Sequence, residues 1–178
     1  MDVPFKNIVV SGDISTGKST LAINLAKSLG WDFFSGGAYF RQWHKEHNIS
    51  LEDTEIIPEK VDRDFEKDVQ NKIRTEEGTV YESQLGGWHA RGLKNVFKVL
   101  CVADFNVRME RASKRDGVSL EEATENSKIR SEALNRKYKK LYGVENRFDP
   151  KYFDLVVDTT TLVPEEVLQE VLKSMGAK

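Results

Sequence analysis

Short apolar runs alternate with stretches of helical periodicity along most of the chain. The run at 5–11 (FKNIVVS) is rich in β-branched residues and ends at a glycine, which is typical of a buried strand. Residues 18–29 then repeat apolar side chains on one helical face, and Gly30 is a typical helix end. The pattern predicts strands at 5–11, 31–35, 79–83, 96–103 and 153–159. It predicts helices at 18–29, 38–47, 61–75, 107–115, 119–141 and 164–175.

This alternation of strands and helices predicts an α/β fold with a parallel sheet covered on both faces. A further helix is expected to start at Ser50, because an acid follows three residues later. The 106–147 stretch is rich in Arg, Lys and Glu, and we expect it to project from the sheet as a solvated helical flap. No repeat or linker divides the chain, so 1–178 is expected to form one domain.

Composition narrows the possible partners. The chain has 178 residues with 27 basic and 29 acidic side chains, a net charge of −2, which argues against a duplex nucleic-acid partner. No apolar run approaches the roughly 20 residues of a membrane span, and the first residues do not resemble a signal peptide. A single cysteine, Cys101, excludes an internal disulfide framework and a cysteine zinc site. We expect a cytoplasmic monomer that binds neither membrane nor nucleic-acid polymer.

One motif carries chemistry. The segment GDISTGKST at 12–20 follows the first predicted strand, opens the first helix and matches the phosphate-binding pattern G-x-x-x-x-G-K-[ST]. Glycines let backbone N–H groups face phosphate oxygens, and the helix N-terminus adds a positive dipole end. Lys18 would neutralise the β- and γ-phosphates of ATP, and the Ser19 hydroxyl would ligate Mg²⁺. The expected ATP-binding residues of this loop are Gly12, Asp13, Ile14, Ser15, Thr16, Gly17, Lys18, Ser19 and Thr20.

Other charged residues could act together with this loop in binding phosphate or magnesium. Arg41 follows the second strand, at the sheet edge where ligands bind, and could form a bidentate contact with a phosphate; an ordinary surface arginine is the alternative. Glu82 ends the third strand and could hold a Mg²⁺-bound water, or could simply be solvated. Asp13 puts an acid inside the loop, where its side chain can point to water. The cations of the charged stretch could meet a transferring phosphoryl group, although such runs are more often a solvated face.

Together these residues resemble the nucleoside monophosphate kinases, most closely the short cytidylate kinases of archaeal type. The similarity runs over 7–175 and rests on six segments: 12–20, 35–41, 85–88 (LGGW), 107–111, 138–144 and 152–159. It implies a P-loop NTPase three-layer sandwich with a five-stranded parallel sheet. It also implies a helical region at about 34–75 that binds the monophosphate, and a short helical lid at about 106–147.

The resemblance also assigns roles to residues. Arg111 and Arg115 would face ATP, and Arg130 would face the transferring phosphoryl group. The catalytic residues would be Lys18, Arg111, Arg130 and Lys137. The acceptor-binding residues would be Ser35, Gly36, Arg41, Gln84, Gly87, Trp88 and Arg130. The metal ligands would be Ser19 and Glu82.

The chain departs from the family pattern at three positions. The family usually has arginine where this chain has Gln84, an acid where it has Leu134, and arginine where it has Lys137. Because seven residues are almost two helical turns, Arg130 and Lys137 share a face, whereas Arg136 points elsewhere. Lysine keeps the charge but not the planar fork of arginine. These changes fall on acceptor recognition more than on ATP binding.

The resulting hypothesis is ATP-dependent phosphorylation of CMP or dCMP, with Mg²⁺ as cofactor and no covalent enzyme intermediate. Two alternatives remain open at this point. One is a kinase for another nucleotide or small acceptor, and the other is an ATP-binding regulatory module that has lost transfer.

Overall fold

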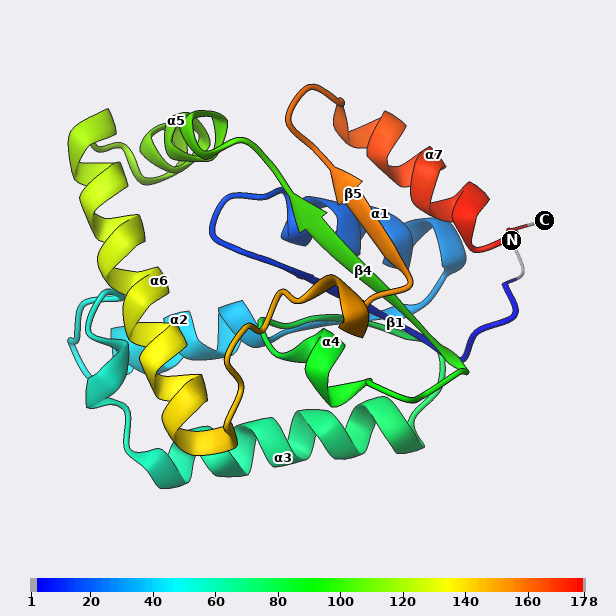
Figure 1. Ribbon diagram of the computed structural model, residues 1–178, viewed down its shortest axis with the longest axis horizontal. Helices are drawn as coiled ribbons and strands as arrows, with labels where there is room; N and C mark the ends of the chain where they lie inside the picture. The colour runs from blue at the N-terminus through cyan, green and yellow to red at the C-terminus, as the bar shows by residue number, and fades with distance from the viewer. Residues whose placement is uncertain (1–2, 178) are drawn as a thin grey trace.

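Five parallel strands form the sheet of the computed structural model, which describes residues 3–177 (Figure 1). The spatial order is β2-β3-β1-β4-β5, so β1 lies in the centre, and it is buried along its whole length. The strands are β1 (Asn7–Gly12), β2 (Asp32–Ser35), β3 (Thr79–Glu82), β4 (Val96–Val102) and β5 (Leu155–Asp158). The predicted α/β class and all five predicted strands are confirmed, with boundaries that differ by at most two residues.

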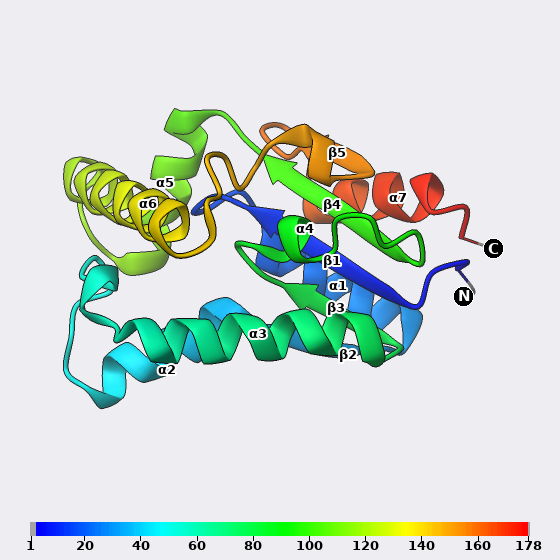
Figure 2. The ribbon, with the colours of Figure 1, turned by 60° about the horizontal axis from the view of Figure 1, so that its bottom comes forward.

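Helices cover both faces of the sheet, as a parallel sheet requires. The α-helices are α1 (Lys18–Leu29), α2 (Gly36–Glu46), α3 (Glu59–Thr75), α4 (Gly86–His89), α5 (Phe105–Asp116), α6 (Leu120–Tyr142) and α7 (Pro164–Ser174). Two 3₁₀ turns, η1 (Thr54–Ile56) and η2 (Pro150–Tyr152), complete the elements. Figure 2 shows α1 and α7 on one face and α3 and α4 on the other.

The alternation of side chains along β1 explains this layering. Ile8 and Val10 face the cluster formed with α1 and α7, whereas Val9 faces α3 and α4. All three side chains are fully buried, so both faces of the central strand belong to the core. Cys101 on β4 lies in the first cluster, and burial raises the pKa of its thiol to about 12, as expected of a core cysteine.

Two local expectations are wrong, and one short helix was not predicted. No α-helix starts at Ser50: its side chain bonds Glu52 within a turn, and α3 begins at Glu59, after Pro58. The short helix α4 was not expected, because its glycine pair predicts a turn. The charged stretch does not project as a free flap, because one face of α6 is buried. Leu134 packs with Leu85 and neighbouring aromatic rings, and α6 also contacts η1.

The arrangement places α5, α6 and α2 at the carboxyl ends of the strands (Figure 1). This edge of a parallel sheet is where loops from several strands converge and where ligands bind in such folds. Within residues 3–177, no helix is both long and apolar enough to cross a membrane.

Candidate active site

The turn between β1 and α1 has a backbone that only glycine tolerates at two positions. Gly12 has a φ of 157°, and a Cβ there would lie 2.6 Å from the Cys101 carbonyl oxygen. Gly17 has a φ of 80° and precedes α1 without a side-chain cap. The first amides of α1 are therefore free of side-chain partners, as a phosphate-binding helix start requires.

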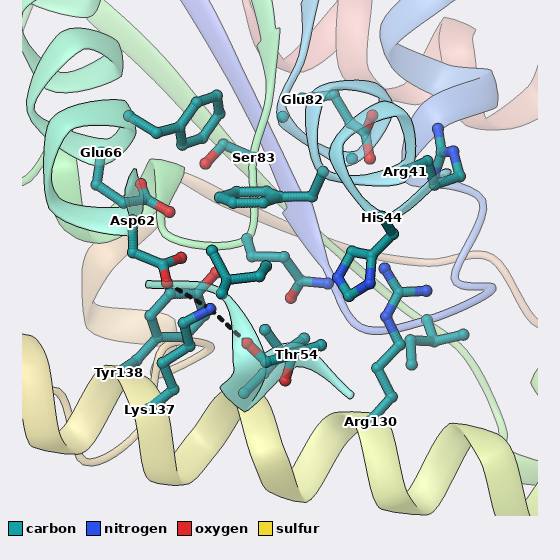
Figure 3. A pocket seen from close by; sticks show the side chains of 18 of the residues that line it. Arg41, His44, Thr54, Asp62, Glu66, Glu82, Ser83, Arg130, Lys137 and Tyr138 are labelled. Atoms are coloured by element: carbon teal, nitrogen blue, oxygen red, sulfur yellow. Dashed lines mark hydrogen bonds and ion pairs between the residues drawn. The ribbon is translucent and has the colours of Figure 1, made fainter. Parts of the chain in front are cut away.

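Two cavities meet at this turn, and they share Lys18, Ser19 and Arg115 in their walls. The outer cavity lies between the β1–α1 turn, α5 and the start of α7. The inner cavity is enclosed by α2, α3 and α6 (Figure 3). A group bound in one cavity can therefore reach a group bound in the other beside the Lys18 ammonium.

Lys18 is held at this junction by opposite charge. Its Nζ lies 3.7 Å from Glu82 Oε1 and donates a hydrogen bond of 3.3 Å to the Asp13 carbonyl oxygen. Burial lowers the pKa of Lys18, while the Glu82 carboxylate opposes that shift. Glu82 is itself buried and accepts a hydrogen bond from Ser35 Oγ. The structure thus brings Glu82 to the phosphate loop, although it ends a different strand.

Arg111 fixes one wall of the outer cavity. Its guanidinium donates to Thr159 Oγ1 at 3.1 Å and to the Thr159 carbonyl oxygen at 2.6 Å. Thr159 Oγ1 in turn donates to the Thr16 carbonyl oxygen at 2.9 Å. This chain of bonds joins α5, the end of β5 and the phosphate loop. Both Arg111 and Arg115, which the resemblance assigns to the ATP side, line the outer cavity.

Three arginines from different helices lie at one end of the inner cavity: Arg41, Arg115 and Arg130. Burial lowers the pKa of Arg130, and the nearby charges of Arg115 and Arg41 lower it further. Its buried Nε has no hydrogen-bond partner. Three positive charges close together, with the Arg130 Nε–H as an unpaired donor, favour the binding of an anion. Gly36 and Gly37 line the same cavity. We call this region the cationic end.

The opposite end of the inner cavity holds an ion pair between Asp62 of α3 and Lys137 of α6, at 2.6 Å (Figure 3). Lys137 Nζ also donates to the Thr54 carbonyl oxygen at 2.9 Å. These contacts turn Lys137 away from Arg130, although both line the cavity as their shared helical face predicted. This placement differs from the role in phosphoryl transfer that the resemblance implied. We call this region the paired end.

The acid of the phosphate loop does not point to water. Asp13 forms an ion pair with Arg108 of α5 at 2.8 Å and accepts a hydrogen bond from Ser131 of α6 at 2.9 Å. Burial alone would raise the pKa of Asp13, but Arg108 and its other partners lower it below the ordinary value. Asp13 therefore ties the loop to both helices above it.

Arg147 supplies a guanidinium beside Gln84, where the family usually has arginine. Its Nε donates to Gln84 Oε1 at 3.1 Å, and it also bonds Asn135 of α6. Arg147 is almost fully buried and lies 3.6 Å from Asp13. A positive charge is thus retained near position 84, but it comes from the segment that follows α6.

Three residues expected to bind the acceptor lie outside the cavity walls. The Ser35 hydroxyl caps α2 by accepting from the Ala38 N–H and also bonds Glu82. The Gly87 N–H donates to Ser11 Oγ at 3.3 Å, and a Cβ at Gly87 would collide with Phe153. Trp88 packs against Tyr142 and beneath the Arg91 guanidinium. These positions shape the site through packing.

The sequence also contained signals that were missed. His44 follows Arg41 by three residues, so both lie on one face of α2, and His44 lines the inner cavity. Asp62 and Glu66 are four residues apart within the apolar face of α3, where a solvated acid is not expected. Glu66 forms a buried hydrogen bond of 2.7 Å with His89 Nε2.

The residues at the junction fit a magnesium ion carried by a nucleotide. The 3–177 portion holds no cluster of three or more His, Cys, Asp or Glu side chains suited to a metal. Mg²⁺ often takes only one or two protein oxygens, together with waters and substrate phosphates. Ser19 and Glu82 lie in the same cavity wall and provide a hydroxyl and a carboxylate of that kind.

Comparison with known proteins agrees with this geometry. A model of the Cytidylate kinase-like family matches residues 7–161. The chain belongs to this family. It is 36% identical over 164 residues to a cytidylate kinase of Pyrococcus abyssi, covering 90% of this chain and 88% of that protein. It is 34% identical over 171 residues to a cytidylate kinase of Ignicoccus hospitalis, covering 94% and 98%.

Similar solved structures support the P-loop kinase fold of this family member. A gluconokinase from Sinorhizobium meliloti superposes with a TM-score of 0.65 at 16% identity, covering 99% of this chain and 94% of that one. A shikimate kinase from Aquifex aeolicus gives 0.57 at 23% identity, covering 96% of each chain. At these identities the likeness shows the fold alone.

Proposed function

We propose that the protein transfers the γ-phosphoryl group of ATP to CMP, which yields ADP and CDP. The observation that carries this proposal is the meeting of two cavities at Lys18, Ser19 and Arg115. ATP would occupy the outer cavity, and CMP would occupy the inner cavity with its phosphate at the cationic end. The named activity of the relatives supports CMP as the acceptor and does not favour the alternatives.

In the reaction, a phosphate oxygen of CMP attacks the γ-phosphorus, and the bond from that phosphorus to the β–γ bridging oxygen breaks. ADP leaves with the electron pair of that bond. Lys18 stabilises the charge that develops on the donor phosphates, because it is held at the junction in a buried setting. Arg130 and Arg115 flank the transferring group, and Arg41 holds the CMP phosphate.

Several features of the site support this division of roles. Magnesium bound with ATP would be held by Ser19 and by Glu82 through water, and it supplies charge neutralisation across the β- and γ-phosphates. Arg111 and its partner Thr159 would position the donor side. Because one chain lines both cavities, the protein can work as a monomer, and ATP and CMP are small solutes of the cytoplasm.

A panel of acceptors tests the proposal. The purified protein is incubated with ATP and Mg²⁺, and the rate of ADP formation is measured with CMP, dCMP, UMP, AMP, GMP or no acceptor. CMP is expected to give the highest acceptor-dependent rate. One slow rate of ADP formation regardless of the acceptor would show ATP hydrolysis in place of transfer.

A further inference from the structure

The paired end of the inner cavity contains charges that the transfer reaction does not require. The side chains of Asp62 and Lys137 are only 3% and 8% exposed. They come from different helices and meet inside the cavity wall, together with the carbonyl oxygen of Thr54 (Figure 3). A buried ion pair is weak evidence for stability, because the cost of desolvation offsets its attraction. The pair therefore points to a role beyond joining the two helices.

Unpartnered polar atoms gather around the same cavity. Within residues 3–177, six buried side-chain nitrogen or oxygen atoms have no hydrogen-bond partner. Four of them belong to residues that line the inner cavity: His44 Nδ1, Thr54 Oγ1, Asp62 Oδ2 and Arg130 Nε. Asp62 Oδ2 contacts Lys137 as an ion pair but is not aligned for a hydrogen bond. Because buried polar groups are normally satisfied, this clustering indicates a polar ligand.

The two ends are spaced along one helix. Arg130 and Lys137 lie on the same face of α6, seven residues apart, which is a rise of about 10 Å. A nucleotide whose phosphate lies near Arg130 therefore directs its base toward Lys137. Phe40, Phe65 and Tyr138 line the space between the helices and offer aromatic surface to a flat ring.

The hydrogen-bonding groups of Asp62 and Lys137 determine which edge of a base they can bind. A carboxylate only accepts hydrogen bonds, and an ammonium only donates them. Their ligand must then present a donor next to an acceptor. Cytosine does so with its exocyclic amino group beside the ring nitrogen N3, and acidic side chains are known partners of that amino group. Uracil presents the opposite order, a carbonyl beside a ring N–H.

We infer that Asp62 and Lys137 select the acceptor base, with Asp62 accepting from the exocyclic amino group and Lys137 donating to the adjacent ring acceptor. This inference rests on the proposed function and adds residues that discriminate cytosine from uracil. Neither residue breaks or forms a bond in the reaction. Glu66, which bonds His89, lines the same cavity one helical turn from Asp62.

The test compares Asp62→Asn with Asp64→Asn. Asp64 lies on the same helix but is exposed, with Lys60 as its partner, so its variant is a matched control. For each protein, kcat/KM is measured with CMP and with UMP. Asparagine keeps the size of the side chain, loses the charge and can donate to the uracil carbonyl. The ratio of kcat/KM for CMP to kcat/KM for UMP is expected to fall about tenfold to a hundredfold in Asp62→Asn. It is expected to stay unchanged in Asp64→Asn.

An equal loss with both acceptors would overturn the inference, because a pair that merely joins α3 to α6 affects every acceptor alike. If Asp62→Asn does not fold, the double variant Asp62→Asn with Lys137→Gln removes both charges at similar size. The same fall in the ratio is expected of the double variant, and an unchanged ratio again contradicts base selection.

Binding measurements separate this inference from the proposed function. Isothermal titration of the native protein and of Asp62→Asn with CMP and UMP, without ATP, reports base selection alone. Preferential CMP binding that depends on Asp62, without any CDP formation, would leave base selection standing and refute transfer. CDP formation, together with equal binding of CMP and UMP by both proteins, would support phosphoryl transfer and refute base selection by Asp62.

Discussion

The phosphate loop and the paired end of the inner cavity lie in one site but are built in different ways. The loop is a continuous segment, 12–20, whose function depends on backbone conformation and on Lys18. The paired end joins η1, α3 and α6, which are separated by many residues in the sequence. A local motif can serve many reactions, whereas a site assembled from distant elements determines which molecule reacts. The comparison suggests that catalysis and selectivity can be altered separately.

The largest expected effect lies at the loop. Lys18→Ala should lower kcat with every acceptor at least about a hundredfold, because a preorganised charge at the transferring group is lost. Lys27→Ala is the matched control, since Lys27 is exposed on the same helix. Steady-state rates and CMP titration check this expectation. If Lys18→Ala retained more than half of the native kcat, the proposed role of Lys18 in phosphoryl transfer would be wrong.

The cationic end should show the next largest effect. Arg130→Ala should lower kcat/KM about tenfold to a hundredfold for all monophosphates, because a charge-assisted contact with phosphate is removed. Arg136→Ala should stay within about twofold, since Arg136 is exposed and pairs with Glu55 and Glu132. Arg130→Lys should recover part of the loss. Equal effects of Arg130→Ala and Arg136→Ala on kcat/KM would contradict a specific role of Arg130 in binding the phosphate.

Arg147 connects the regions and affects stability. Arg147→Ala removes a buried guanidinium from Gln84, Asn135 and Asp13, and should lower the free energy of unfolding by about 2 kcal/mol. Thermal unfolding should then shift downward by about 4–8 °C. Circular dichroism during heating measures the shift. A melting temperature equal to that of the native protein would mean that Arg147 is not needed to hold α6 near the loop.

The smallest effect concerns pH at the paired end. Burial raises the pKa of Asp62 to about 6, with the positive charge of Lys137 opposing the shift. Below that value the carboxyl is protonated and donates, so it no longer prefers the amino group of cytosine. The ratio of kcat/KM for CMP to that for UMP should therefore fall a few-fold (about 2–5) as pH drops from 8 to 5.5. The charged or titratable groups around Asp62 are Lys137, Glu59, Glu66, Tyr138 and Tyr142, and His89 contacts Glu66.

Taking the ratio cancels the titration of the acceptor phosphate, which CMP and UMP share. In Asp62→Asn the ratio should be flat over the same range. A pH-dependent ratio that persists in this variant would assign the titration to another group.

The sequence predicted the sheet and the loop because both depend on local patterns. Apolar runs predicted five strands, and the 12–20 motif predicted a strand, a tight turn and a helix start in that order. The position of Glu82 at the loop also followed from parallel strands sharing one edge. Helical spacing correctly placed Arg130 and Lys137 on one face of α6.

The partners of these side chains could not be predicted from spacing. Nothing local links Asp13 to Arg108, or Gln84 to Arg147, because both pairs form only when α5, α6 and the following loop fold over the sheet. The pairing of Asp62 with Lys137 likewise joins residues 75 positions apart (137 − 62). The charged stretch was misjudged for the same reason, because Arg108 and Lys137 within it pair with acids of the phosphate loop and of α3.

Transfer of a labelled γ-phosphoryl group tests the central claim most directly. The protein is mixed with ATP labelled in that group, Mg²⁺ and CMP, and the products are separated by chromatography. The account predicts label in CDP, in amounts equal to the ADP formed, and almost none in Lys18→Ala. Label that appears in inorganic phosphate at a rate independent of CMP would contradict it.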